Sequence, residues 1–372
     1  MSEYEGPRGT RKEELPALGA LVGECFPGPP FNLNSGFRLF AEENAENLRI
    51  MLHQGRPVSH AGLVYFDLSI LGCEVKVGCI GCVCTHPDYR NQGLAGRLLQ
   101  DAWEKLRRDG IDFALISGNR SLYWRAGCGA CRPTYTYMVP PGGGGAPLAG
   151  LAADDPRLHL DEMQKIYQAE PVHFCRSRED LEGITRPWPE RSDKAVFARL
   201  EKRAYLVGWR WLMQEGGDFI EVLEYAGDRN LLAERAPALA AEFGLPLRFN
   251  VPAWEEEFRL GLEKVGRQSD FSDCQEGTIK ILALGRLLEK LRPFWEPKMS
   301  KELAERLSFF QFLEEAEIGL GKENLKLKGQ EAAELVFGTA EAKEWAPDRP
   351  ALGEALKDLF PLPGPRYGLN FI

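Results

Sequence analysis

Residues 83–96 combine the residue types that bind a phosphorylated cofactor. They read V-C-T-H-P-D-Y-R-N-Q-G-L-A-G, so a short apolar strand leads into a turn and then into a basic loop that contains a glycine. The loop opens directly into an amphipathic helix. The first N–H groups of a helix have no partner within it and lie at the positive end of its dipole, so they can donate to a pyrophosphate. The spacing therefore predicts a phosphate-binding strand, loop and helix.

The helix is predicted by an apolar stripe at helical spacing. Gly93 has no Cβ and lets a phosphate approach the backbone, and Arg90 adds a positive charge. The stripe consists of Leu94, Ala95, Leu98, Leu99, Ala102, Trp103 and Leu106. The residues that we expect to bind the cofactor are Val83, Cys84, Arg90, Asn91, Gln92, Gly93, Leu94, Ala95 and Gly96.

This loop resembles the acetyl-CoA loop of the GCN5-related N-acetyltransferases (GNATs). Their pattern is Gln/Arg-x-x-Gly-x-Gly/Ala, and residues 90–95 read R-N-Q-G-L-A. A second motif, residues 122–128 (L-Y-W-R-A-G-C), matches the family's Leu-Tyr-x-x-x-Gly-Phe, except that Cys128 replaces the phenylalanine. The resemblance implies acetyl-CoA as the cosubstrate. The alternative interpretation is a glycine-capped helix in another α/β fold.

Length and charge set limits on the class of protein. The chain has 372 residues, enough for two or three domains. Its 46 Lys and Arg against 55 Asp and Glu give a net charge of −9, which argues against a general nucleic-acid binder. No apolar run approaches the ~18 residues of a membrane span, and the N-terminus does not read as a signal peptide. We expect a cytoplasmic protein whose partners include neither nucleic acid nor a membrane.

Two Cys-x-x-Cys pairs in the sequence have the spacing of metal ligands. Cys79-x-x-Cys82 and Cys128-x-x-Cys131 could together suggest four thiolate ligands for zinc. Residues three apart on a regular strand point to opposite faces, however, so Cys79 and Cys82 could not both face one metal ion. We therefore expect no metal, and no disulfides in a reducing compartment.

Glycine and proline divide the chain into regions. Residues 140–147 (P-P-G-G-G-G-A-P) read as a linker. Before the linker, the pattern predicts a helix over 13–26, strands over 48–53, 58–67 and 74–85, the cofactor helix, a strand over 113–117, a helix around Tyr123 and a strand over 134–139. After it, the pattern predicts a helix over 161–168, strands over 204–209 and 219–225, a helix over 231–243 and a strand over 247–251.

The region after the linker repeats the strand, helix, strand order without a phosphate loop. At the corresponding place, residues 225–231 read Y-A-G-D-R-N-L, which lacks Gly-x-Gly/Ala, and Asp228 would repel a phosphate. We interpret it as a degenerate acetyltransferase-like domain; the alternative is an unrelated α/β domain. In the last hundred residues, a leucine stripe from Ile279 to Leu291 predicts a helix, residues 324–327 a strand and residues 329–337 a second helix. This order resembles a sterol-carrier-protein-like domain.

The combination resembles the enhanced intracellular survival (Eis-like) family of acetyltransferases. The resemblance implies an α/β (α+β) fold with a GNAT domain at residues 1–141, a linker at 142–150, a degenerate GNAT-like domain at 151–272 and a sterol-carrier-protein-like domain at 273–372. It implies that Tyr123 acts as the general acid and the C-terminal carboxylate of Ile372 as the base. It also implies a homo-oligomer, commonly a hexamer in that family.

The chemistry of acetyl transfer agrees with these roles. The reaction must polarise the thioester carbonyl, deprotonate the amine and protonate the departing thiolate. A backbone N–H near Val83 or Cys84 could serve the carbonyl. Tyr123, with an ordinary pKa near ~10, stays protonated at neutral pH. The cofactor strand (residues 78–85, G-C-I-G-C-V-C-T) contains no glutamate base, so the base must come from elsewhere.

Alternatives stay open for each of these assignments. The apolar end of the chain could dock on the core, and Tyr123 could be a core aromatic. His53 and His60, which we expect at strand ends, and His86 are rival bases. A protein that binds acyl-CoA or a lipid without turnover is the competing class. The acceptor is expected to be a small-molecule or peptide amine, and no residue identifies it.

Overall fold

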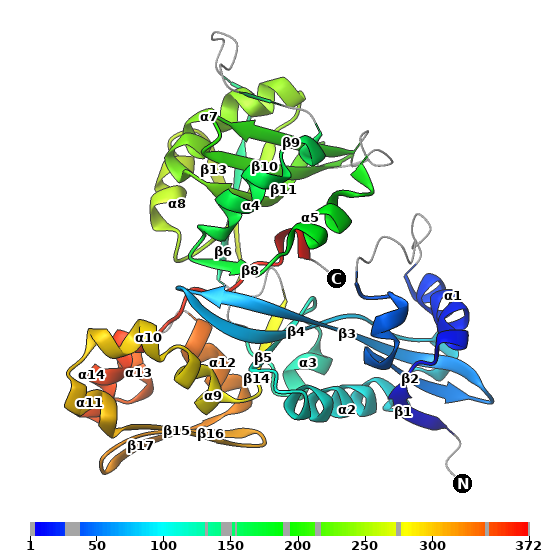
Figure 1. Cartoon of the computed structure of the whole chain (residues 1–372), viewed down its shortest axis with the longest axis vertical. Coiled ribbons are helices and arrows are strands. Elements are labelled where there is room, and N and C mark those ends of the chain that lie inside the picture. Colours follow the sequence, from blue (N-terminus) through cyan, green and yellow to red (C-terminus); the bar gives the residue numbers. More distant parts are fainter. Residues whose placement is uncertain are drawn as a thin grey trace. The chain divides into compact units, whose positions relative to one another are not determined.

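The fold is described from a computed structural model of the chain (Figure 1). It describes residues 4–26, 38–130, 133–142, 151–152, 155–188, 194–212, 217–272, 277–338 and 342–370. The chain forms two compact units. The first comprises Met1–Cys131 with Glu276–Leu362, and the second comprises Arg132–Gln275 with Pro363–Phe371.

The first unit is built on a mixed sheet that surrounds the predicted loop. Its strands run in the order β1 (Glu5–Gly9), β2 (Leu48–His53), β3 (Arg56–Ile70), β4 (Cys73–Thr85), β5 (Phe113–Ile116) and β14 (Thr278–Ile281). Neighbouring strands are antiparallel, except that β4 and β5 are parallel and are connected through helix α2 (Leu94–Arg108). A parallel pair needs such a crossover, so the phosphate loop and its helix lie between two adjacent strands.

Helices cover both faces of this sheet. Leu99, Trp103 and Leu106 of α2 pack on the face that carries Leu63 and Ile80. Helix α1 (Leu15–Cys25) packs its Leu18, Leu21 and Val22 on the opposite face, which carries Val64. Leu63 and Val64 are adjacent in β3, and successive side chains of a strand point to opposite faces. The short helix α3 (Ser121–Arg125) follows β5.

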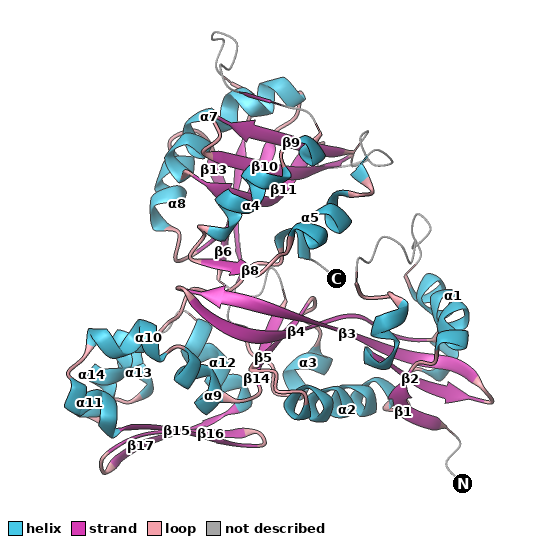
Figure 2. Cartoon of the chain, in the orientation of Figure 1, coloured by secondary structure: helices cyan, strands magenta, loops and turns pink. Residues whose placement is uncertain are grey.

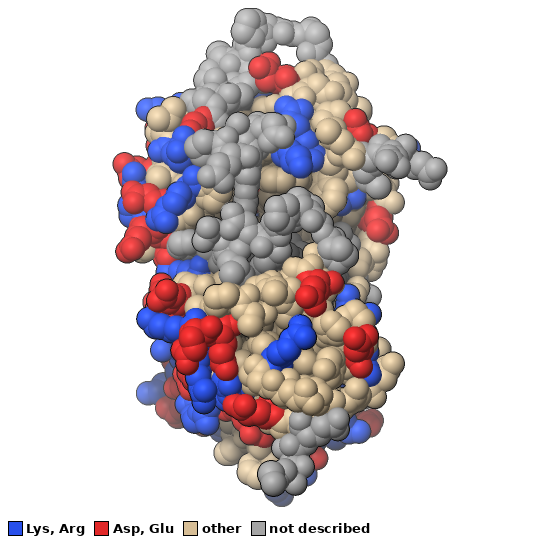
Figure 3. Space-filling view, turned by 90° about the vertical axis from the view of Figure 1, so that its right-hand side faces the viewer, with Lys and Arg blue, Asp and Glu red and all other residues tan. Residues whose placement is uncertain are grey.

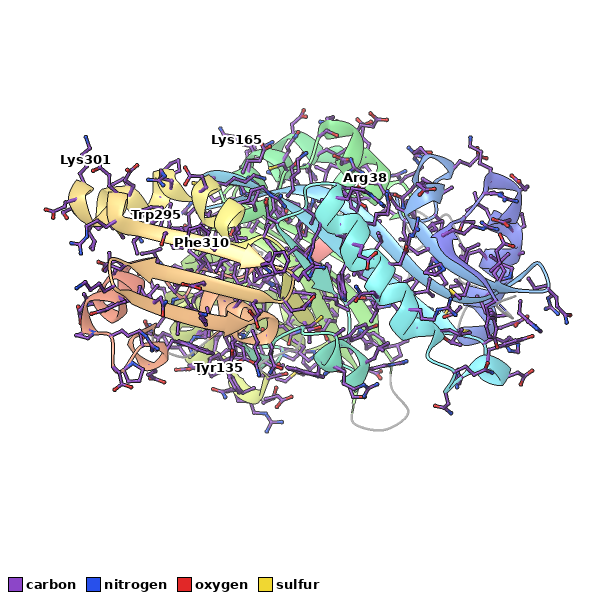
Figure 4. All side chains as sticks on the ribbon, turned by 90° about the horizontal axis from the view of Figure 1, so that it is seen from below. Arg38, Tyr135, Lys165, Trp295, Lys301 and Phe310 are labelled. Atoms are coloured by element: carbon purple, nitrogen blue, oxygen red, sulfur yellow. The ribbon has the colours of Figure 1, made fainter. Side chains whose placement is uncertain are left out.

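The C-terminal part of the first unit adds a small antiparallel sheet and several helices. The sheet order is β15 (Leu307–Phe312), β16 (Glu315–Leu320) and β17 (Glu323–Lys328). The helices are α9 (Leu284–Lys290), α10 (Arg292–Trp295), α11 (Lys301–Arg306), α12 (Gly329–Phe337), α13 (Ala342–Trp345) and α14 (Pro350–Leu359). The buried Trp295 packs on Phe309 with ring centroids 5.9 Å apart, whereas Phe310 is exposed (Figure 4).

The second unit contains its own sheet, flanked by helices (Figure 2). The strand order is β13 (Arg267–Ser272), β6 (Thr134–Val139), β12 (Leu247–Pro252), β11 (Phe219–Gly227), β10 (Ala204–Trp211), β9 (Ala195–Leu200) and β7 (Leu151–Ala152). β11 and β12 are parallel and are joined through α7 (Arg229–Phe243). The unit also contains β8 (Val172–Phe174) and helices α4 (Leu160–Gln168), α5 (Arg178–Thr185), α7 (Arg229–Phe243) and α8 (Glu256–Glu263).

This division differs from the boundaries expected from the sequence. β6, predicted as the last strand of the first domain, lies in the sheet of the second unit because it pairs with β12 on one edge and β13 on the other. Ile279 was predicted in a helix but lies in β14, where it pairs with Leu115. The predicted linker at residues 142–150 lies outside the described residues except for Gly142.

Two surface properties can be stated for the described residues. No helix among them is long and apolar enough to cross a membrane. On the face that Figure 3 shows, Lys and Arg are interspersed with Asp and Glu, so this face carries no extended basic surface.

Candidate active site

The predicted loop has an open, left-handed backbone where the helix begins. Gly93 is the N-cap of α2 with φ +74°, and a Cβ built on it would meet nothing within 4 Å. The same open space surrounds Gly96. The first intrahelical hydrogen bond runs from Arg97 N to Gly93 O at 3.1 Å, so the N–H groups of Leu94, Ala95 and Gly96 precede it. These donors lie at the positive end of a fifteen-residue helix, where an anion is stabilised.

Side chains tie the loop to the neighbouring strands. Arg90 Nε donates to Thr85 O at 3.2 Å, which turns the loop back toward the end of β4. The Tyr4 hydroxyl donates to Gln92. Asn91 also has a positive φ of +63°, and both Asn91 and Gln92 are exposed. The loop is therefore held at both ends while its outer surface stays accessible.

Strand β4 contains a bulge just before the loop. His60 pairs with Cys84 and Gly62 with Gly81, so Ala61 of β3 faces two residues of β4, Cys82 and Val83. Cys82 has φ +51°, which is uncommon for a residue other than glycine. A bulge interrupts the ladder and turns backbone groups of the strand away from it. Val83 and Cys84, the residues expected to offer an N–H to the thioester, lie at this interruption.

The parallel pairing of β4 with β5 ends shortly before the bulge. The last pair in the register is Ile80 with Ile116, and Ser117 N still donates to Ile80 O at 3.2 Å. Within the described residues, β4 continues to Thr85 without a further partner on its β5 side. An extended acyl-pantetheine arm could pair with this open edge, as an added strand would.

Tyr123 lies on α3, beside the segment that follows β5. Its side chain is buried, with 7% of its surface exposed, and a Cβ built on Gly118 would lie 2.8 Å from its ring. Burial raises the pKa of Tyr123 above its ordinary value. Among the described residues, none forms a hydrogen bond with its hydroxyl. The hydroxyl therefore stays protonated at neutral pH and its proton is not committed to another acceptor.

A buried lysine that the sequence did not predict supports α3. Lys280 of β14 is fully buried, and its Nζ donates to Ala126 O at 2.7 Å and contacts Glu314. Glu314 also accepts from Arg107 of α2 at 2.7 Å. The two cations pair with one carboxylate and connect α2 and the C-terminal end of α3 with the turn between β15 and β16. Alternation of polar and apolar residues in Thr278–Ile281 was a signal for this strand.

A cavity of about 1050 Å³ opens beside the loop within the first unit. It is lined by Gly93, Gly96 and Gln100 on α2 and by Trp124 and Arg125 on α3. Its far wall comes from the start of α12 and the neighbouring hairpin, with Glu314, Glu315, Lys328, Gly329, Gln330, Glu331 and Glu334. Pockets for cofactor-sized ligands have volumes of roughly 300–1,000 Å³.

The three histidines considered as bases lie in different surroundings in the first unit. Ile372 lies outside the described residues. His60, expected at a strand end, lies inside β3 and is fully buried, which lowers its pKa to about 4. His53 Nδ1 lies 3.0 Å from the Tyr89 hydroxyl. His86 caps the turn after β4, with its Nε2 3.4 Å from a Glu24 carboxylate oxygen.

Three of the four cysteines considered as metal ligands lie in the described part of the chain: Cys79 and Cys82 on β4, and Cys128 just after α3. No group of three or more His, Cys, Asp or Glu residues there is placed to hold a metal ion, and Cys131 lies outside it. The premise of a regular strand was wrong, because the bulge falls on Cys82. Burial raises the pKa of Cys82 to about 12, so its thiol stays protonated.

Comparison with known proteins agrees with this geometry. Residues 7–131 match a family model described as an acetyltransferase (GNAT) domain. This range contains the β4 bulge, the loop, α2 and Tyr123. It covers about a third of the chain. No match is found among the curated proteins.

Several solved structures share the fold, two of them over nearly the whole chain. A GCN5-related N-acetyltransferase from Anabaena variabilis is 13% identical with a TM-score of 0.63, covering 98% of this chain and 97% of that one. Eis1 from Mycobacterium abscessus is 10% identical with a TM-score of 0.63, covering 98% of both chains. A probable N-acyltransferase from Enterococcus faecalis is 15% identical with a TM-score of 0.54, covering 77% and 74%. The expected fold class is confirmed: the chain has a mixed α/β fold with a GNAT fold and additional structure. Together with the family model, the likeness supports acyl transfer as the class of reaction.

Proposed function

We propose that this protein is an N-acetyltransferase that moves an acetyl group from acetyl-CoA to a primary amine. The observation that carries the proposal is the convergence, in one unit, of an open helix N-terminus at Gly93, a bulged strand at Cys82 and a buried tyrosine hydroxyl at Tyr123. The helix N-terminus binds the phosphates, the bulged strand gives access to the thioester carbonyl, and the tyrosine hydroxyl protonates the leaving thiolate.

The cofactor-binding residues are those of the loop and the end of β4. The N–H groups of Leu94, Ala95 and Gly96 bind the pyrophosphate, and Arg90, Asn91 and Gln92 flank it. Val83 or Cys84 offers a backbone N–H to the carbonyl, and the pantetheine arm follows the open edge of β4. The cavity beside Gly93 offers room for the nucleotide end of the cofactor.

The chemical step is a direct attack of the amine. The amine nitrogen forms a bond with the thioester carbonyl carbon, and the carbon–sulfur bond breaks. The Tyr123 hydroxyl supplies a proton to the departing sulfur. The C-terminal carboxylate of Ile372 accepts the proton that the amine loses. This assignment of the base rests on the family resemblance and on the lack of a glutamate in residues 78–85.

The remaining assignments extend the same proposal. The second unit is a GNAT-like domain that does not bind CoA, because Asp228 already caps α7 by accepting from Leu231 N at 2.9 Å. Residues 273–372 include a sterol-carrier-protein-like part, and the protein assembles as a homo-oligomer. The acceptor is a small-molecule or peptide amine. The competing function is an acyl-CoA sensor or a lipid carrier that performs no transfer.

The test is acetyl-CoA consumption, followed by free-thiol release, against polyamines, aminoglycosides, amino acids and lysine peptides. We expect release that depends on one class of amine and that is lost in a Gly93→Glu variant. Tight acetyl-CoA binding by calorimetry without release on any amine would overturn the enzyme and favour the sensor. Absence of both binding and release would overturn the cofactor site itself.

A further inference from the structure

The cavity beside the phosphate loop continues along one face of α2. Its lining residues on this helix recur every three or four positions, which is the spacing of residues on one side of a helix: Gly93, Gly96, Leu99, Gln100 and Trp103. The step from Gly93 to Trp103 corresponds to about 15 Å along the helix axis. Since the pyrophosphate is proposed to bind at the first turn, a ligand has room to extend from there along α2.

Two glycines let the far wall of the cavity approach α3. A Cβ built on Gly127, just after α3, would lie 2.8 Å from Lys280 Nζ. One built on Gly329, the first residue of α12, would lie 3.2 Å from Gly127 O. Gly129 N also donates to Ile279 O at 2.8 Å, which connects the segment after α3 with β14. The two walls are thus held by contacts within the first unit, so the cavity is preformed and a ligand need not order it.

Carboxylates line the far wall, and partners within the protein engage them. The four are Glu314, Glu315, Glu331 and Glu334. Glu314 pairs with two cations, Lys280 and Arg107. Glu331 accepts from the Lys328 backbone N–H at 2.7 Å, at the positive end of α12. The acidic residues of this wall are therefore largely committed to the structure of the wall itself.

Two further cations line the cavity and are available to a ligand. Arg125 of α3 and Lys328 at the end of β17 are both exposed. Arg125 Nη1 donates to Ser121 Oγ at 3.0 Å, and Lys328 lies opposite Glu315 in the register of β16 and β17. Among the described residues, no carboxylate forms an ion pair with either side chain. Together with the two cations already paired to the far wall, they balance its four carboxylates, and the positive end of α2 favours an anion.

Trp124 offers an aromatic surface to the same cavity. Its indole is half-buried, and Nε1 donates to Asn119 O at 2.9 Å, which fixes the ring. Trp124 directly precedes Arg125 in α3. Bases stack on such a ring because every base has a π-face. The lining therefore combines a surface for a base with two cations for a phosphate.

We propose that this cavity binds the 3′-phosphoadenosine end of acetyl-CoA, with the adenine stacked on Trp124 and the 3′-phosphate bound by Arg125 and Lys328. This inference rests on the proposed function, in which the first unit binds the diphosphate at Gly93. It assigns a role in cofactor recognition to the far wall, which comes from residues 314–334 and lies outside the range that matches the family model. The protein should therefore select CoA over a cofactor that lacks the 3′-phosphate.

The test compares the affinities of free CoA and 3′-dephospho-CoA by calorimetry, which requires no turnover. The wild type should bind CoA at least about tenfold more tightly, because the 3′-phosphate accepts charge-assisted hydrogen bonds. Arg125→Met with Lys328→Met should abolish this preference and change the affinity for dephospho-CoA less than about threefold, since solvent screens the exposed charges from the diphosphate. Lys326→Met is the matched control, because Lys326 is exposed on the same face of β17 but lies outside the cavity lining. It should keep the preference.

A separate variant tests the surface for the base. Trp124→Leu removes the ring and should weaken the binding of CoA and of dephospho-CoA alike, by at least about fivefold, because both carry adenine. Unchanged affinity in Trp124→Leu would overturn the stacking. Equal affinities of the wild type for the two cofactors, or a preference that survives in the double variant, would overturn the phosphate site. A wild type that prefers CoA but releases no thiol on any amine would contradict the proposed function and still support this pocket, whereas binding of neither cofactor would overturn both.

Discussion

At the scale of single residues, burial acts in opposite directions on Tyr123 and His60. Tyr123 is buried and its pKa is raised, which keeps the hydroxyl protonated. His60 is buried and its pKa is lowered to about 4, which keeps the imidazole neutral. In both cases the low-dielectric surroundings disfavour the charged form. The sequence identified Tyr123 as a candidate acid and His60 as a candidate base. The structure distinguishes them: Tyr123 keeps its proton and can act as an acid, whereas His60 is enclosed between paired strands.

The role of Tyr123 predicts a specific kinetic defect. Tyr123→Phe removes the hydroxyl and keeps the ring that packs on Gly118, so acetyl-CoA affinity should change less than about twofold. Turnover should fall by about 10²-fold, the usual contribution of a general acid. Tyr65→Phe is the matched control, because Tyr65 is partly buried in the same unit and its hydroxyl donates to Asp109 instead. Thiol release and calorimetry measure the two quantities. Equal turnover in the wild type and Tyr123→Phe would remove Tyr123 as the acid.

The burial of His60 predicts a loss of stability toward acid. In the unfolded chain a histidine binds its proton near pH 6.5, whereas in the fold His60 binds it only near pH 4. Between these values the unfolded state binds more protons, so stability falls as the pH falls from 6.5 to 4, and the effect is absent above 6.5. The full effect is roughly 3 kcal/mol.

Urea unfolding of the wild type and His60→Gln across this pH range measures the effect. The difference in unfolding free energy between the two proteins should shift in favour of His60→Gln as the pH falls. His86→Gln, which changes a half-buried histidine at a turn, should follow the wild type. Parallel curves for wild type and His60→Gln would show that His60 can take up a proton inside the fold.

At the scale of elements, local patterns predicted the cofactor helix and its loop well. The apolar stripe predicted α2, and the strand predicted over residues 48–53 is β2 at its observed bounds. Two features depended on distant partners, and local patterns missed them. Residues Thr278–Ile281 form a strand because β5 offers an open edge, although their leucine-rich continuation reads as helix. The bulge at Cys82 arises from the pairing of β3 with β4 and directly follows the pair of Gly62 with Gly81.

The loop predicts that one glycine is essential for cofactor binding. Gly93→Glu places a carboxylate at the open start of α2 and forces a non-glycine residue to adopt φ +74°. Acetyl-CoA affinity should fall at least about 10²-fold, since the added charge repels the phosphates at close range. Gly110→Glu is the matched control: Gly110 follows the other end of the same helix with φ +79° and equally open surroundings. It should cost about 1 kcal/mol of stability and leave affinity unchanged. Normal binding by Gly93→Glu in calorimetry would refute the loop as the phosphate site.

At the scale of the whole molecule, the chain does not divide in the linear order that its motifs suggest. Residues 276–362 return to the first unit and complete its sheet with β14, and residues 363–371 return to the second. A sequence pattern detects local periodicity only, so it assigns each segment to the domain of its neighbours along the chain. The partners of β6 and β14 lie more than a hundred residues away along the chain, so local patterns could not place these strands.

The two units, although similar in strand order, should respond differently to acetyl-CoA. In the first, the N–H groups at the start of α2 precede any intrahelical bond and face open space. In the second, Asp228 accepts from Leu231 N at 2.9 Å, so one of the three corresponding helix donors is already satisfied by a carboxylate, and a second carboxylate, that of Glu170, accepts from Gly227 N just before the helix at 2.7 Å. Hydrogen exchange with saturating acetyl-CoA should therefore slow in peptides covering residues 80–97 and 113–125. Peptides covering 219–243 should exchange at the rate of the free protein, and Gly93→Glu should abolish the response. Protection at 227–232 would mean that the second unit also binds the cofactor, because a ligand slows exchange where it reduces local opening.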